Sequence, residues 1–145
     1  MALQFQLVKI GTPQFAIIND NEVSEPLQIN LEVNFAVDKD ISSIKNTIKV
    51  VYLNSNEPVM QLIVDCYYSV SPDSWKEMTN SDNSIIVPVG FLQHIATITV
   101  GTTRGILHEK TEGTNMNKYI LPLINVTEMV KNNMVVMPKT TPSTK

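Results

Sequence analysis

Two histidines are the residues best suited to proton transfer. His94 and His108 are the only histidines of the chain, and histidine is the usual general acid or base near neutral pH. Both fall in one segment with helical spacing, fourteen residues apart, which is about 21 Å along a helix axis. Two groups at that separation cannot share a catalytic centre. We therefore expect each to be an exposed or packing histidine.

The other reactive residue types also lack partners. Cys66 is the single cysteine, which excludes an intrachain disulfide and a cysteine-rich zinc site. It lies on the apolar side of an alternating segment, where a free cysteine usually behaves as a small hydrophobe. Residues 38–40 begin like a calcium loop but lack its later glycine and glutamate. No glycine-rich phosphate loop is present. The sequence predicts no enzyme activity, no cofactor and no metal site.

Arg104 is the only arginine, and Gly105 follows it. A guanidinium presents several N–H donors in a rigid fork. Because the surrounding segment has few charges, we expect the Arg104 guanidinium to donate specific hydrogen bonds to backbone carbonyls or to a carboxylate. Structural support is favoured over ligand recognition, and both stay open.

Composition narrows the class of protein. The chain has 145 residues, of which 43% are hydrophobic and 17% are charged, as expected of one globular domain. A formal net charge of −3 argues against nucleic-acid binding, which needs a basic face. No apolar stretch approaches the roughly 20 residues that span a membrane, and the start does not look like a secretory leader. A cytoplasmic protein is expected.

The first half of the chain predicts strands. Apolar and polar residues alternate over residues 27–37, the signature of a strand with one buried face. Further alternating segments cover residues 3–17, 44–53 and 60–70. The polar turn at residues 54–58 joins the last two into a hairpin.

The second half predicts helices and irregular segments. Ser71 and Pro72 suit the start of a short helix. Apolar spacings of three and four favour a long helix over residues 88–109, although its many β-branched residues alone favour a strand. Residues 118–126 are expected to be extended, and Thr127 is expected to cap a short helix over residues 127–131.

This order of elements is typical of an α+β fold. We expect a four-stranded antiparallel sheet with the long helix and the short C-terminal helix packed on one face. Residues 1–131 would form a single domain. Residues 132–145, which end in a stretch rich in Pro, Thr, Ser and Lys, would form a flexible tail.

The sequence resembles the SecB family of protein-export chaperones. Residues 5–10 and 27–33 are similar to that family's first two strands. The more specific match is the Arg104-Gly105 pair late in the long helix, followed by a proline–apolar–asparagine segment at residues 121–126. On this resemblance Arg104, Gly105, Pro122 and Asn125 have structural roles, and the fold is a four-stranded sheet backed by two helices.

The resemblance also implies a function. Family members are not enzymes; they hold unfolded polypeptides without ATP and pass them to the Sec translocase motor. Their protomers pair into dimers and tetramers, so a homodimer or homotetramer is expected here. Some relatives instead serve toxin–antitoxin systems. Two hypotheses therefore stay open: a general holdase for protein export, and a binding or scaffold protein for one dedicated partner.

Two sets of residues are candidates for these contacts. Methionine is adaptable and suits broad recognition of apolar chains. The resemblance places six apolar or aromatic residues beside the peptide-binding grooves: Trp75, Met78, Met116, Tyr119, Leu123 and Met129. The alternative that they cap the core or an oligomer interface stays open. Four apolar residues fall on the nominally polar faces of their strands and are the predicted oligomer interface: Val51, Leu53, Ile63 and Tyr67.

Overall fold

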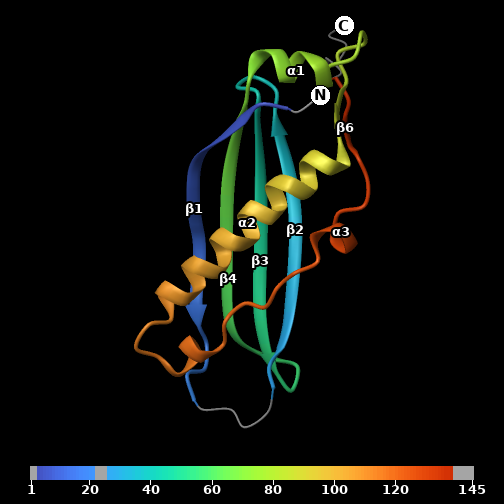
Figure 1. Ribbon diagram of the computed structural model, residues 1–145. Coiled ribbons are helices and arrows are strands. Elements are labelled where there is room, and N and C mark those ends of the chain that lie inside the picture. The colour runs from blue at the N-terminus through green and yellow to red at the C-terminus, as the bar shows by residue number, and fades with distance from the viewer. Residues whose placement is uncertain (1–2, 22–25, 139–145) are drawn as a thin grey trace, which may run out of the picture.

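Four long strands form the sheet that the alternation predicts (Figure 1). The computed structural model describes residues 3–21 and 26–138. The strands are β1 (Phe5–Ile17), β2 (Gln28–Asp38), β3 (Ser43–Asn54) and β4 (Glu57–Val70). They pair antiparallel in the order β1-β4-β3-β2, so β1 and β2 are the two edges. The predicted antiparallel sheet is confirmed.

The two edge strands differ in regularity. β2 pairs with β3 without a register shift from one end to the other. β1 pairs with β4 across two irregularities, one between Leu7 and Lys9 and one between Gly11 and Gln14. The second interval contains Pro13, which lacks the N–H that a central strand needs. Bulges and proline of this kind are common devices that blunt an exposed sheet edge.

The turn between β3 and β4 follows directly from its residues. Ser55 and Asn56 both have positive φ, at 50° and 68°. Positive φ at both central residues is the geometry of the type I′ two-residue hairpin, and asparagine tolerates it better than most residues. The predicted hairpin is confirmed.

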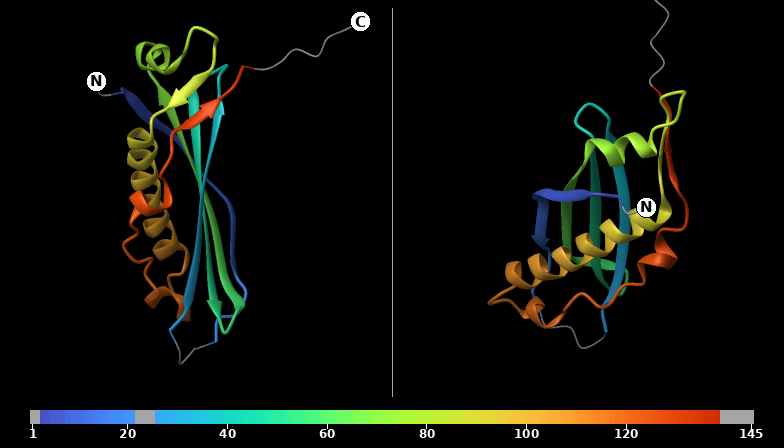
Figure 2. Two further views of the ribbon diagram at one scale, coloured as in Figure 1. Left: turned by 90° about the vertical axis from the view of Figure 1, so that its right-hand side faces the viewer. Right: turned by 45° about the horizontal axis from the view of Figure 1, so that its top comes forward.

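The long helix α2 (Val89–Lys110) covers one face of the sheet (Figure 2). Its buried residues, among them Leu92, Ile95, Ala96 and Leu107, pack on the apolar rows of β3 and β4. The predicted helix over residues 88–109 is confirmed. The short helix α1 (Pro72–Met78) begins where predicted, because Ser71 Oγ accepts a hydrogen bond from Ser74 N at 3.3 Å.

Threonine hydroxyls make the β-branched segment of α2 compatible with a helix. Thr97, Thr99, Thr102 and Thr103 each donate to the carbonyl four residues earlier, at 2.7–3.0 Å. A hydroxyl that finds this local acceptor is satisfied inside the helix, even in the core. In α2 the helical spacing of the apolar residues therefore outweighs the β propensity of the individual residues.

Two core tyrosines reach polar partners in the layer that covers the sheet. Tyr68 donates to the Ile95 carbonyl at 3.0 Å and lies 2.7 Å from Thr99 Oγ1. Tyr52 donates to the Tyr119 carbonyl at 3.2 Å. Burial raises the pKa of Tyr52 to about 12, with a smaller opposing effect from Arg104. Burial likewise raises the pKa of Tyr68 well above its usual value, which its hydrogen bond to Thr99 only partly offsets.

These shifts predict a steep loss of stability at alkaline pH. An unfolded tyrosine ionises near pH 10, whereas the folded Tyr52 and Tyr68 keep their protons. Between pH 10 and 12 the unfolded state therefore binds fewer protons, and stability falls by roughly 1.4 kcal/mol per pH unit for each tyrosine. Urea unfolding of the wild type and of a Tyr52→Phe variant, followed from pH 9 to 12, measures the difference. If stability fell equally steeply with pH in the wild type and in Tyr52→Phe, the raised pKa of Tyr52 would not contribute to the alkaline loss.

The chain after α2 departs from the predictions in two places. The short helix α3 (Val126–Met129) has Asn125 at its cap position with no side-chain capping bond, so the predicted cap at Thr127 is wrong. Residues 132–138 do not continue as a free tail, because β6 (Met134–Val136) pairs with β5 (Ile85–Val87). The predicted tail boundary at residue 132 is therefore too early. Residues 139–145 lie outside the described part of the chain.

Candidate polypeptide-binding surface

An irregular segment, residues 119–133, runs beside α2 on the covered face of the sheet; we call it the strap (Figure 1). It follows the short 3-10 helix η1 (Asn115–Lys118), contains α3 and leads into β6. Arg104 Nε donates to the Leu121 carbonyl at 2.8 Å, and Arg104 Nη2 donates to the Pro122 carbonyl at 2.9 Å. Of the two kinds of acceptor expected for Arg104, backbone carbonyls and a carboxylate, the structure shows backbone carbonyls.

The other end of the strap is fixed near the start of α2. Gln93 Nε2 donates to the Val130 carbonyl at 2.8 Å. Asn133 Oδ1 accepts from Val89 N at 2.8 Å and so supplies one of the acceptors that a helix N-terminus needs. Val126 and Val130 are buried against the body of the protein. The strap is thus held at both ends by α2.

Several strap side chains point away from the core. Leu123 is 92% exposed, Ile120 is 61% exposed and Met129 is 41% exposed. Leu121, two residues before Leu123, is only 1% exposed. The fixed backbone therefore presents apolar side chains to solvent at defined positions.

The six predicted groove residues do not gather at one place. Met78 and Met116 lie in the protein core at 4% and 1% exposure, so their predicted place on an open groove is corrected. Trp75 is half-buried on α1, at the end of the sheet opposite η1 (Figure 1). Tyr119 is half-buried, and Leu123 and Met129 are exposed, all on the strap. The accessible members are thus concentrated on the strap.

The remaining predicted structural residues are less involved than Arg104. Pro122 contributes its carbonyl to Arg104. Gly105 is exposed on α2, with nothing within 4 Å of the position a Cβ would take. Asn125 is exposed, and its Oδ1 accepts from Thr127 Oγ1 at 2.6 Å.

The predicted interface residues share the sheet face turned away from α2, which we call the open face. Val51, Leu53, Ile63 and Tyr67 are all half-buried there. Lys9 Nζ lies 5.0 Å from the ring centroid of Tyr67, a cation–π contact. No helix or strand of residues 3–21 and 26–138 lies across this face (Figure 2).

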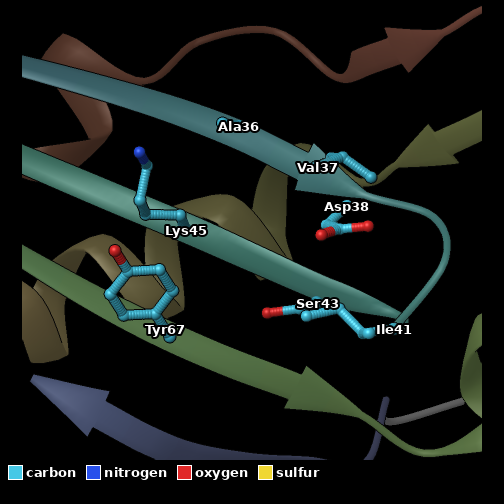
Figure 3. A pocket seen from close by; sticks show the side chains of 7 residues that line it. All are labelled: Ala36, Val37, Asp38, Ile41, Ser43, Lys45 and Tyr67. Atoms are coloured by element: carbon cyan, nitrogen blue, oxygen red, sulfur yellow. The ribbon is translucent and has the colours of Figure 1, made fainter.

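A small pocket lies at one end of the open face (Figure 3). Its volume is about 200 Å³, below the 300–1,000 Å³ usual for small-molecule sites. Lys45 and Tyr67 lie together at one end of the pocket, Ile41 lies at the other, and Asp38 and Ser43 lie between them. The pocket has room for a single side chain.

The reactive side chains are placed as the sequence predicts. His94 and His108 are exposed on α2. Cys66 is fully buried, and burial raises the pKa of its thiol, which keeps it protonated at neutral pH. No group of three or more His, Cys, Asp or Glu side chains suited to a metal ion occurs in the described segments. None of the helices in those segments is long and apolar enough to cross a membrane.

Comparison with solved structures relates this arrangement to known proteins. The SecB-like chaperone of Mycobacterium tuberculosis, solved with a ChAD peptide from the HigA1 antitoxin, matches at a TM-score of 0.53 and 15% identity. The match covers 83% of this chain and 90% of that one. The fold is SecB-like. A Streptococcus agalactiae protein of unknown function matches at a TM-score of 0.43 and 12% identity, covering 77% of this chain and 90% of that one. No family model and no curated protein matches the sequence.

The contacts that fix the strap on this SecB-like fold were only partly visible in the sequence. Arg104 stood out because it is the only arginine. Gln93 and Tyr52 also hold the strap, and Asn133 of the strap accepts from the first residue of α2. All three are ordinary polar or aromatic residues with no motif around them. On this fold the strap carries three of the exposed large apolar side chains, Ile120, Leu123 and Met129.

Proposed function

We propose that the protein is an ATP-independent holdase-type chaperone that binds unfolded polypeptides. One observation carries the proposal: an apolar side chain, Leu123, stands 92% exposed on a backbone that Arg104 fixes through the two preceding carbonyls. Ile120 and Met129 are exposed on the same strap. Exposed apolar groups gathered on one rigid segment mark a binding surface more often than scattered ones do. The SecB-like fold supports the proposal.

Such a surface suits weak binding of unfolded polypeptides of varied sequence. Apolar burial contributes roughly 25 cal/mol per Å², so a few side chains give modest affinity per site. Several sites on an oligomer would add avidity without tight binding at any one of them. This is the behaviour that a holdase needs, since it must later release its client.

An aggregation assay tests the proposal. Stoichiometric protein, without nucleotide, is expected to suppress the aggregation of several unrelated proteins diluted from denaturant. Light scattering at a range of molar ratios gives the stoichiometry. Protection of none of these clients would reject the general holdase.

A dedicated-partner function is the second candidate. The solved SecB-like neighbour binds a peptide from an antitoxin, which favours this candidate. Protection of one partner at low concentration, together with no protection of unrelated clients, would establish it over the general holdase. Export of clients, delivery to the Sec translocase motor and a cytoplasmic location stay predictions. Co-sedimentation of a client-loaded complex with the purified motor would test delivery.

We also propose that the open face forms the contact of a homodimer or homotetramer. Four half-buried apolar residues on an uncovered sheet face are the support for this. Ile63→Lys is expected to lower the mass measured by light scattering at micromolar concentration, because it places a charge in the contact. Thr97→Lys, on the exposed side of α2, is the control and should leave the mass unchanged. A monomeric wild type would reject the proposal.

A further inference from the structure

The two edges of the sheet are built differently, and only one carries the usual devices against strand pairing. β1 contains Pro13 and Lys9 and has two irregularities in its register with β4. β2 is eleven residues long, pairs with β3 in unbroken register and contains neither proline nor lysine. Proline, lysine and bulges at an edge hinder another chain from adding to the sheet. The outer edge of β2 is therefore the one suited to accept a further strand.

The outer edge of β2 is accessible over most of its length. In the order β1-β4-β3-β2, no strand of the described segments pairs with this edge. In the left view of Figure 2 the edge faces the reader, and the strap lies with α2 to one side of the sheet. Only the last residues of β2 have a neighbour there, because Val37 lines a groove together with Val136 and Met137. Residues 28–35 remain free, which is longer than a common strand of 5–6 residues.

The free stretch of β2 is complementary to a second copy of itself. Its odd-numbered residues are apolar and half-buried on the covered face, and its even-numbered residues are polar and exposed on the open face. A two-fold axis that is perpendicular to the sheet and passes through a β2 residue pairs odd residues with odd and even with even. Apolar side chains of the two copies then lie together on one face and polar side chains on the other.

The only charge in the free stretch limits the register. Glu32 is the single charged residue among residues 28–35. A two-fold axis through Glu32 would set the two glutamates directly opposite each other, which is destabilising. An axis through Leu31 instead sets Glu32 opposite the partner's Asn30 and opposes no like charges. It pairs residues 28–34 of both copies and stays clear of β6.

We propose that β2 pairs antiparallel with β2 of a second copy about a two-fold axis at Leu31, so that two four-stranded sheets join into one of eight strands. This contact is separate from the open face and does not depend on the holdase function. Its axis is perpendicular to the sheet, whereas the axis of a contact across the open face is parallel to the sheet. Two contacts with perpendicular two-fold axes are what a closed dihedral tetramer requires.

Two substitutions of opposite charge at Asn30 test the pairing. Asn30 is exposed and lies opposite the uncharged Val51 in its own sheet. Asn30→Glu is expected to weaken association about three- to tenfold, because it sets a glutamate opposite the partner's Glu32 at two symmetric places. Asn30→Lys is the matched control, which sets opposite charges there and should associate at least as tightly as the wild type. Sedimentation velocity over a range of concentrations gives the dissociation constants.

Cysteine cross-linking reports the register directly. Leu31→Cys places two thiols opposite each other at the axis, so oxidation with diamide is expected to give a disulfide-linked dimer. Ile29→Cys is the control, because the two thiols would then be four residues apart, about 13 Å along the strands. The native Cys66 is buried and should not react.

The results that overturn the pairing are distinct. They are a monomeric wild type, equal cross-linking of Leu31→Cys and Ile29→Cys, and association of Asn30→Glu as tight as that of the wild type. Protection of the β2 amides from hydrogen exchange only after addition of reduced, carboxymethylated lactalbumin would assign this edge to unfolded clients and would also overturn it. Loss of association in Ile63→Lys but not in Asn30→Glu would leave the open face as the contact and reject the edge.

Discussion

Leu123→Asp is expected to abolish most aggregation suppression while leaving the protein folded. Leu123 is 92% exposed, so the substitution removes nothing from the core. Burying a leucine against a client contributes about 1.5–3 kcal/mol, and an aspartate in the same contact must also lose its hydration. Because 1.4 kcal/mol corresponds to tenfold, we expect client affinity to fall at least tenfold. Fluorescence anisotropy with a labelled unfolded client measures the change.

Two controls make that result specific to the apolar contact. Leu123→Met keeps an apolar side chain of similar volume and should retain most of the affinity. Glu128→Gln changes charge on the exposed side of α3 and should have little effect. If Leu123→Asp protected clients as well as the wild type, the strap would not be the client-binding surface.

Leu121→Ala is expected to destabilise the fold strongly, in contrast to Leu123→Ala two residues away. Leu121 is 1% exposed and lies at the strap end that Arg104 holds. Truncation of a buried leucine to alanine typically costs about 2–5 kcal/mol, from lost transfer energy and the cavity left behind. Leu123→Ala should change the free energy of unfolding by less than about 0.5 kcal/mol.

Urea unfolding of the two alanine variants gives both values under one condition. Equal destabilisation would show that the two side chains share one environment. A small effect at Leu121 would show that the strap contributes little to the stability of the body.

The sheet and the long helix were predictable because their patterns are long. β2 alternates without interruption over eleven residues, so its two faces are unambiguous. α2 was ambiguous by residue type, yet its apolar spacing extended over about four turns, from Phe91 to Ile106, and its threonines found carbonyl acceptors inside the helix. In both elements a repeated signal outweighed individual propensities.

The strap and the two-stranded sheet of β5 and β6 were not predictable in the same way. β5 and β6 have three residues each and come from distant parts of the chain, so neither carries a measurable period. Met78 and Met116 were assigned to a groove on residue type, although methionine fills irregular core gaps equally well. Which of these places it takes depends on packing between segments that the linear sequence does not join.

The strand order has a consequence for the kinetics of folding. β2, β3 and β4 follow one another through short turns, so their pairings close small loops. β1 pairs with β4 on the far side, joining Phe5 to Val70, and this contact closes most of the sheet's sequence into one loop. The three-stranded meander is thus the expected nucleus, and docking of the N-terminal strand the late step. Pulsed amide labelling during refolding would find β3 protected before β1.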